Sequence, residues 1–229
     1  MTLRVIDTGL AGADWNVAVT AALSDLHQRG QIGDTLRLHR YHRAVLLGLH
    51  SPKSQIDAAA CARLGAQIVR RVSGGGAVAM GPGVLAWDLL ITRPRAMAPE
   101  EVSAGICTAV AAALAPFGAT ASFRAPGDIT TGGQKIGGTA GLFDVTSMLH
   151  QGSLLVMPDL DEMAVLLGVD SLPVTTLALA ARNTPDMRAV TDAVTAAIAD
   201  ALGLQIATGT LSAAETELAR GVTLPEVTA

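Results

Sequence analysis

The chain has 229 residues, of which half are apolar, a formal net charge of −4 and only three Phe, two Trp and one Tyr. This length allows a substantial core, built mainly from aliphatic side chains, and the sequence pI of about 5.7 argues against a general nucleic-acid-binding surface. The mean hydropathy is +0.42, but charged residues or glycines break each apolar run before the roughly 20 residues that a membrane-spanning helix needs. Since the N-terminus also lacks an apolar run of signal-peptide length, we expect a cytoplasmic protein that acts on neither nucleic acid nor membrane.

The first third of the chain predicts a helix, two short strands, a second helix and a third strand. Asp14 is a candidate N-cap for the first helix, which ends before Gly30. Ser54 together with Asp57 opens the second helix. The predicted ranges are 15–29, 35–39, 44–49, 54–64 and 66–71.

The last of these strands runs into two arginines and a glycine-rich stretch, Arg70-Arg71-Val72-Ser73-Gly74-Gly75-Gly76-Ala77-Val78. Three consecutive glycines cost roughly 0.5–1 kcal/mol each in a regular element, so they need a physical reason. Bare backbone amides next to guanidinium groups favour a bound anion, and a tight structural turn is the alternative. Alternation along the strand predicts that only one of the two arginines faces such a site. We call residues 73–77 the glycine loop.

The next predicted strand, 84–91, is nearly all apolar, which is typical of a strand covered on both faces. Asp88 interrupts it. This carboxylate is either paired with a neighbouring arginine, such as Arg70 or Arg71, or exposed at a sheet edge. A helix follows at 100–116, with acidic residues at its positive N-terminal end.

The two cysteines and five histidines show no metal-binding or disulfide pattern. Cys61 and Cys107 both fall within predicted helices, without a basic partner or a local motif that would activate the thiol. We therefore expect them to be small buried hydrophobes, and we expect no metal held entirely by protein ligands.

Residues 125–141 predict a hairpin that turns at a Gly-Gly pair, residues 132–133. Its return strand carries Lys135, the only lysine besides Lys53 in a chain with fourteen arginines. An ammonium group beside glycines can hold phosphate or carbonyl oxygen, and a solvated hairpin lysine is the alternative. Asp128 either caps a turn or belongs to the same site.

The remaining elements are a strand at 152–157, a helix that begins near Asp159 and ends before Gly168, a helix at 185–202, a strand from 205 and a short helix at 212–220. His150 precedes the first of these strands and either faces a site or satisfies a loop. Because no linker or repeat interrupts the chain, we expect a single domain over residues 1–229.

Several of these segments occur in the order and spacing of one family. Residues 70–78, Asp128, residues 133–140 and residues 150–155 resemble the lipoate-protein ligase branch of the biotin/lipoate ligase superfamily. That branch shows Arg-Arg-x-Ser-Gly-Gly-Gly-Ala-Val, Lys-(Ile/Val)-x-Gly-(Ser/Thr)-Ala and His-x-Gly-(Ser/Thr)-Leu-Leu motifs, and the resemblance extends over roughly residues 14–203. Two positions depart from it. The chain has residues 79–81, Ala-Met-Gly, where relatives commonly carry His-Asp, and Gly127 replaces an Asn.

The resemblance implies an α+β fold, in which helices flank a mixed central sheet, and an enzyme that uses ATP and Mg²⁺ to convert lipoate to lipoyl-AMP. It implies that Lys135 is catalytic and stabilises charge on carboxylate and phosphate oxygens, and that Asp128 positions Mg²⁺ or the adenylate. The residues that it implies for binding the substrate and adenylate are Arg71, Ser73, Gly74, Gly75, Gly76, Ala77, Asp128, Gly138, Thr139, Ala140 and His150.

The partner that the resemblance implies is the lipoyl carrier domain of a 2-oxoacid dehydrogenase or of a glycine-cleavage H-type protein, whose lysine is acylated. The accessory C-terminal domain of many such ligases is expected to be absent here, which allows for a separate accessory subunit. Two alternatives remain open. One is an octanoyl or lipoyl transferase that uses a cysteine nucleophile, although Ser122 stands where one such branch has its cysteine. The other is a catalytically impaired lipoate-binding protein.

Overall fold

The structure is a computed structural model that describes residues 1–94 and 97–227. Its centre is a mixed eight-stranded sheet in the order β11-β1-β2-β6-β10-β9-β8-β7, in which only the β11-β1 and β1-β2 pairs are parallel. The strands are β1 (Thr2–Ala11), β2 (Thr35–Tyr41), β6 (Val84–Thr92), β7 (Ala121–Arg124), β8 (Asp128–Thr131), β9 (Gln134–Phe143), β10 (Ser147–Leu155) and β11 (Gln205–Thr208).

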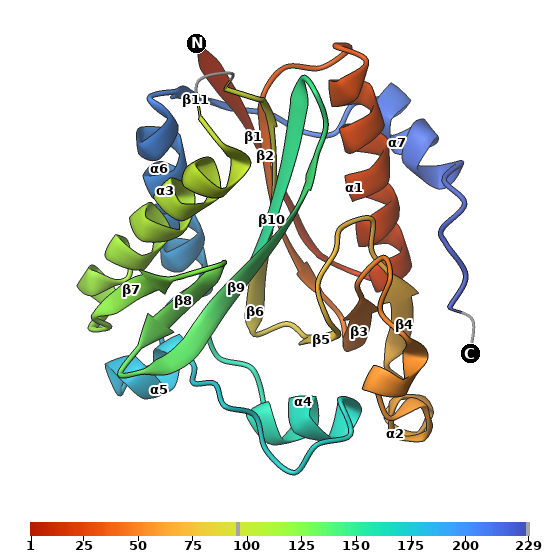
Figure 1. The fold of residues 1–229 in the computed structure, drawn as a ribbon, viewed down its shortest axis with the longest axis vertical. Helices are drawn as coiled ribbons and strands as arrows, with labels where there is room; N and C mark the ends of the chain where they lie inside the picture. Colours follow the sequence, from red (N-terminus) through yellow and green to blue (C-terminus); the bar gives the residue numbers. More distant parts are fainter. Residues whose placement is uncertain (95–96, 228–229) are drawn as a thin grey trace.

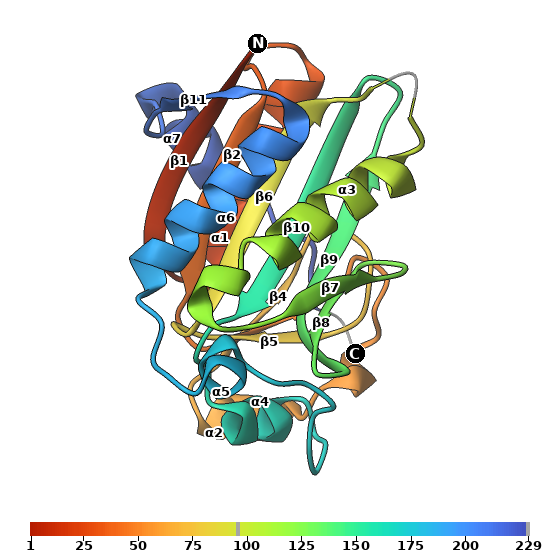
Figure 2. The same ribbon diagram turned by 90° about the vertical axis from the view of Figure 1, so that its left-hand side faces the viewer.

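Helices cover both faces of this sheet (Figures 1 and 2). On one face lie α3 (Pro99–Ala112) and α6 (Met187–Leu202), which also pack against each other. On the other face lie α1 (Ala13–Gln28) and α7 (Ala213–Arg220). The α+β class with a mixed central sheet, expected from the sequence, is confirmed.

A smaller three-stranded sheet, in the order β4-β3-β5, lies on the α1 side. It comprises β3 (Ala44–Leu47), β4 (Gln67–Arg70) and β5 (Val78–Met80), and the glycine loop connects β4 to β5. The short elements are α2 (Ala58–Arg63), α4 (Leu160–Leu166), α5 (Leu177–Ala181) and two 3-10 turns, Lys53–Gln55 and Ala115–Phe117.

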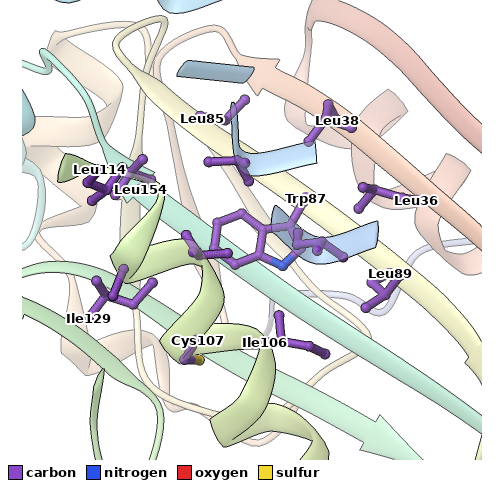
Figure 3. Packing of buried hydrophobic residues seen from close by; sticks show 14 of the residues in the cluster. Leu36, Leu38, Leu85, Trp87, Leu89, Ile106, Cys107, Leu114, Ile129 and Leu154 are labelled. Carbon is purple, nitrogen blue, oxygen red and sulfur yellow. The ribbon is translucent and has the colours of Figure 1, made fainter. Parts of the chain in front are cut away.

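Trp87 is the largest fully buried side chain, and it occupies the centre of the core between the sheet and helix α3 (Figure 3). Its indole lies against Gly152 on the neighbouring strand β10, where any Cβ atom would overlap the ring. A strand glycine here makes room for an aromatic side chain from the adjacent strand.

The helices begin where local caps allow, which moves some predicted boundaries. Asp57, Asp159 and Asp186 each accept a backbone hydrogen bond at the N-terminus of α2, α4 and α6. Helix α1 begins at Ala13, so Asp14 lies in its first turn rather than at the N-cap position. Strand β10 begins five residues earlier than predicted, which places His150 inside the strand.

One helical segment, Pro99–Phe117, is long and apolar enough by composition to cross a membrane. Val102, Ile106 and Val110 from this segment are buried in the core against the sheet. This packing is typical of the core helix of a globular protein.

Candidate active site

A cavity of about 520 Å³ opens on the α1 side of the large sheet. Its wall is formed by the glycine loop, β5, helix α4, residues 172–174 and the residues of β2, β6, β9 and β10 that face this side. Most of these side chains are aliphatic, and a few polar groups converge among them. This combination is typical of a site for a small organic ligand.

The glycine loop is held by several hydrogen bonds against the segment that follows strand β3, at residues 49, 51 and 55. Ser51 Oγ donates to Gly75 O at 2.7 Å. Gly75 has φ +89°, and a Cβ there would lie 2.8 Å from Arg71 Nη2. Gly48 packs against the same carbonyl so closely that a Cβ would overlap it. Gly48 and Gly75 are therefore required by a close backbone approach, whereas a Cβ on Gly74 or Gly76 would meet no atom at short distance. The loop forms one wall of the cavity.

The two arginines before the loop have different environments. Arg71 lines the cavity and is 8% exposed, and its guanidinium donates to Leu46 O at 3.0 Å and Gly74 O at 2.6 Å. Arg70 instead donates to the carbonyls of Gly48 and Ser51, each at 2.8 Å, and does not line the cavity. The prediction that only one arginine faces the site is confirmed. Burial lowers the pKa of Arg71.

Lys135 lies in the cavity wall near the start of β9, with its side chain 39% exposed. Its Nζ is 2.6 Å from Asp128 Oδ1, and Asp128 Oδ2 accepts from Arg124 Nη2 at 2.9 Å. Burial raises the pKa of Asp128, but the hydrogen bonds from Lys135 and Arg124 outweigh it and the net shift is downward. Asp128 therefore balances part of the charge of Lys135 on one side, and the ammonium group remains accessible from the cavity on the other side.

Asp128 itself does not line the cavity. Both of its carboxylate oxygens are already engaged by cationic side chains, which fits an ion pair that positions Lys135 better than it fits a Mg²⁺ ligand. Within residues 1–94 and 97–227, no group of three or more His, Cys, Asp or Glu is placed to hold a metal. We therefore derive no step through a protein-held metal ion.

The backbone around Lys135 brings its ammonium toward the middle of β9. A Cβ on Gly138 would lie 2.7 Å from Lys135 Nζ, so the glycine makes space for the amine. Thr139 N and Oγ1 both donate to Gly127 O, at 2.8 and 3.1 Å, which fixes the strand next to β8. Gly138, Thr139 and Ala140 all line the cavity, as the resemblance implied.

Residues 172–174, which follow helix α4, close the cavity beside Lys135. Val174 forms a parallel bridge with Lys135, and Thr175 N donates to Lys135 O at 2.8 Å. Leu172, Pro173 and Val174 all contribute to the wall. The sequence provided no motif for this segment, because its contact with β9 is non-local.

A buried polar cluster lies at the β2–β6–β10 end of the cavity. Asp88 is fully buried, and its Oδ2 accepts from Arg37 Nη1 at 3.0 Å and from Thr20 Oγ1 at 2.7 Å. The prediction of a structural pair is confirmed, but Arg37 is the partner and not Arg70 or Arg71. Arg70 and Arg71 lie at the end of β4 in the small sheet, whereas Arg37 is directly opposite Asp88 on β2. His39 and Tyr41 share this end of the cavity.

His150 does not reach the cavity. It is 1% exposed, its Nδ1 accepts from Trp87 Nε1 at 3.3 Å, and its Nε2 lies 3.0 Å from Ser103 Oγ on α3. Burial lowers its pKa to about 4. The structure thus corrects the expectation that His150 binds substrate, because its strand position points it into the opposite face of the sheet. The next residue, Gln151, lines the cavity instead.

The remaining predicted residues divide between the cavity and its supports. Gly75, Gly76 and Ala77 line the cavity. Ser73 and Gly74 do not: Ser73 is fully buried, and the Gly74 carbonyl accepts the bond from Arg71. These two residues therefore support the conformation of the loop without lining the cavity.

Neither cysteine lines the cavity, in agreement with the prediction that both are buried hydrophobes. Cys61 Sγ lies 3.6 Å from Leu166 O, and Cys107 Sγ lies 3.7 Å from Thr139 Oγ1 on the core side. Burial raises the pKa of both thiols, so neither is poised as a thiolate nucleophile.

With this geometry established, the family of the chain follows from comparison with known proteins. The model of the lipoyl protein ligase A/B catalytic domain matches residues 13–199. The chain belongs to this family. A search of curated proteins found no match to this sequence.

Solved structures of lipoate ligases share the fold. Protein Ta0514 from T. acidophilum, with bound lipoic acid, is 22% identical with a TM-score of 0.85, over 96% of this chain and 94% of that one. Lipoate-protein ligase A bound with ATP gives 22% identity and a TM-score of 0.85, over 96% and 93%. The bipartite lipoate protein ligase of Thermoplasma acidophilum, studied with its E2 lipoyl domain, gives 21% and 0.82, over 96% and 90%.

Proposed function

We propose that this chain is a single catalytic domain that activates the carboxylate of lipoate with ATP and transfers the lipoyl group to a lysine of a lipoyl carrier domain. The observation that carries the proposal is the position of Lys135: it lies in the wall of a mainly aliphatic cavity, beside backbone glycines. When the substrate carboxylate binds at Lys135, its acyl tail can pack against the aliphatic side chains of the cavity wall.

The chemistry consists of two balanced transfers. A carboxylate oxygen attacks the α-phosphorus of ATP, the bond to the bridging oxygen breaks, and pyrophosphate leaves as the acyl-adenylate forms. The neutral carrier amine then attacks the acyl carbon, the bond to the phosphate oxygen breaks, and AMP and a proton are released as the amide forms. Lys135 stabilises negative charge on oxygen in both steps, and the cavity holds the acyl group in place.

The transferase alternative is disfavoured because it needs a cysteine nucleophile next to the acyl group. Cys61 and Cys107 are buried outside the cavity, and Ser122, at the position of one branch's cysteine, lies on β7 with its Oγ 3.4 Å from Thr130 Oγ1. An impaired lipoate-binding protein would keep the same cavity, so only activity separates it from a ligase.

The decisive experiment mixes the full chain with lipoate, ATP and Mg²⁺ and measures pyrophosphate release and lipoyl-AMP formation. We expect both products. Acyl transfer from an acyl carrier protein without ATP would contradict the proposal in favour of a transferase, and lipoate binding without either reaction would favour the impaired homologue.

A second assay supplies prepared lipoyl-AMP and a lipoyl carrier domain. Transfer in this assay, with no adenylation in the first, would show that activation needs a separate accessory subunit. The bipartite ligase among the similar structures makes such an arrangement worth testing.

A further inference from the structure

Two residues of the stretch Ala79-Met80-Gly81, which departs from the pattern of the family, belong to the wall of the cavity. Met80 lines the cavity from strand β5 and is only 4% exposed. Met163 lines it from helix α4 and is 7% exposed. Both side chains belong to one buried apolar cluster. Two flexible, unbranched thioether side chains therefore close the cavity on its inner side.

The mouth of the cavity lies at the glycine loop and Lys135. Gly75 and Gly76 in the loop are exposed, whereas Met80, at the end of the strand that follows, is buried. The side chain of Lys135 is 39% exposed. Exposure of the cavity wall therefore falls from the loop toward Met80. Since an apolar tail is more stable out of water, a ligand whose carboxylate binds at Lys135 extends its tail toward the two methionines.

The order of strands in the large sheet separates these two ends. Lys135 lies on β9, and β10 lies between β9 and β6. Met80 directly precedes the turn into β6, in which Val84 N donates to Gly81 O at 3.0 Å. Two strand spacings, about 10 Å, therefore separate the strand of the lysine from the strand that follows Met80. This separation leaves room for a hydrocarbon tail of several methylene groups.

The inner side of the cavity offers apolar contacts to such a tail. Leu155 and Ala86 line the cavity and belong to the same buried cluster as the two methionines. Tyr41 belongs to this cluster too, and its hydroxyl is already engaged by His39 Nε2 at 3.1 Å. Each methylene group that a ligand buries here should tighten its binding about fourfold.

We propose that Met80 and Met163 form the end wall of the acyl site and set the longest chain that it accepts. This inference rests on the proposed function, because it takes Lys135 as the carboxylate end. A chain that stops before the two methionines gains affinity with each added methylene group. A longer chain must displace the methionines from a packed cluster or leave its last methylene groups in water, so the gain in affinity ends there.

The test measures how affinity depends on chain length, with saturated fatty acids from hexanoate to tetradecanoate. Titration calorimetry on the full chain, below the concentrations at which these acids form micelles, gives the dissociation constants. In the wild type the constant should fall about fourfold per methylene group and then stop falling. Met80→Ala removes Cγ, Sδ and Cε, so the fall should continue for about two further methylene groups. Met157→Ala, the same substitution at a 37% exposed residue outside the cavity wall, should keep the wild-type limit.

The outcomes separate the two proposals. Wild-type affinity that still rises up to tetradecanoate, or a limit that is unchanged in Met80→Ala, overturns the end-wall inference alone. Failure of lipoate and of all the fatty acids to bind, with and without ATP, overturns the proposed function as well. If Met80→Ala proves unfolded by circular dichroism, Met163→Ala replaces it with the same expected extension of the limit.

Discussion

The two faces of strands β6 and β10 have opposite characters. On the α3 side, Trp87 is enclosed in the core (Figure 3). The buried His150 lies beside it and forms side-chain hydrogen bonds with Trp87 and Ser103. On the α1 side, the adjacent residues Asp88 and Gln151 belong to the cavity and its polar cluster. Neighbouring residues of one strand therefore differ in role, because one packs in the core and the next faces the cavity.

This contrast shows where the sheet uses its polar groups. On the core face, both ring nitrogens of His150 have hydrogen-bond partners, Trp87 and Ser103. The cavity face has an ion pair, a glutamine and a histidine, two atoms of which are unpaired among the described residues. Substitutions in the core or at the buried Asp88–Arg37 pair beneath the cavity should therefore affect stability, whereas substitutions at the partly exposed Lys135 should affect activity.

The largest effect on stability is expected from Asp88→Asn. The change leaves the fully buried guanidinium of Arg37 without its counter-charge, which costs about 3–5 kcal/mol when a buried pair is broken. Urea unfolding measures the loss. Asp170→Asn, the same substitution at an exposed residue, should change the free energy of unfolding by less than about 0.5 kcal/mol. A loss below about 1 kcal/mol for Asp88→Asn would show that the pair is not a structural support of the cavity.

Lys135→Ala should separate activity from stability. Removing one preorganised positive group costs about 10²–10³-fold in rate, measured as pyrophosphate release with lipoate and ATP. The side chain is 39% exposed, so loss of its pair with Asp128 should cost no more than about 1 kcal/mol of stability. Lys53→Ala removes the only other lysine and should retain full activity. Equal rates for the two variants would refute the role of Lys135.

The sequence allowed prediction of those parts of this contrast that depend on local signals. Helix caps and glycine stops gave most elements, and the glycine loop and Lys135 were recognised by their motifs. The partner of Asp88 was not, because Arg37 lies in a distant strand and only the sheet order brings the two together. His150 was assigned to the site and Gln151 was overlooked, since a shift of one residue in a strand exchanges its faces.

Two glycines on opposite faces offer a sharper test. In Gly152→Ala the new methyl group would overlap the ring of Trp87, and such overpacking costs about 1–3 kcal/mol of stability. In Gly138→Ala it would lie 2.7 Å from Lys135 Nζ and displace a flexible amine, so activity should fall while stability stays nearly unchanged. Thermal unfolding and pyrophosphate release on both variants measure the difference. Loss of stability in both would mean that the cavity face is packed as tightly as the core.

The effect that is smallest at neutral pH is a change in the pH dependence of stability on the core face. Burial lowers the pKa of His150 to about 4, from about 6.5 in the unfolded chain. Between these values the unfolded state binds a proton that the folded state does not, so stability falls by about 1.4 kcal/mol per pH unit as the pH drops. His150→Gln keeps a hydrogen-bond acceptor for Trp87 without titrating, so its unfolding free energy should fall less steeply between pH 6.5 and 4. His39 remains in the variant and retains its own share of the slope, since its pKa is lowered to about 3. An unchanged slope would mean that His150 is accessible to protons in the folded state. Weaker lipoate binding by this variant would mean that His150 contributes to the cavity.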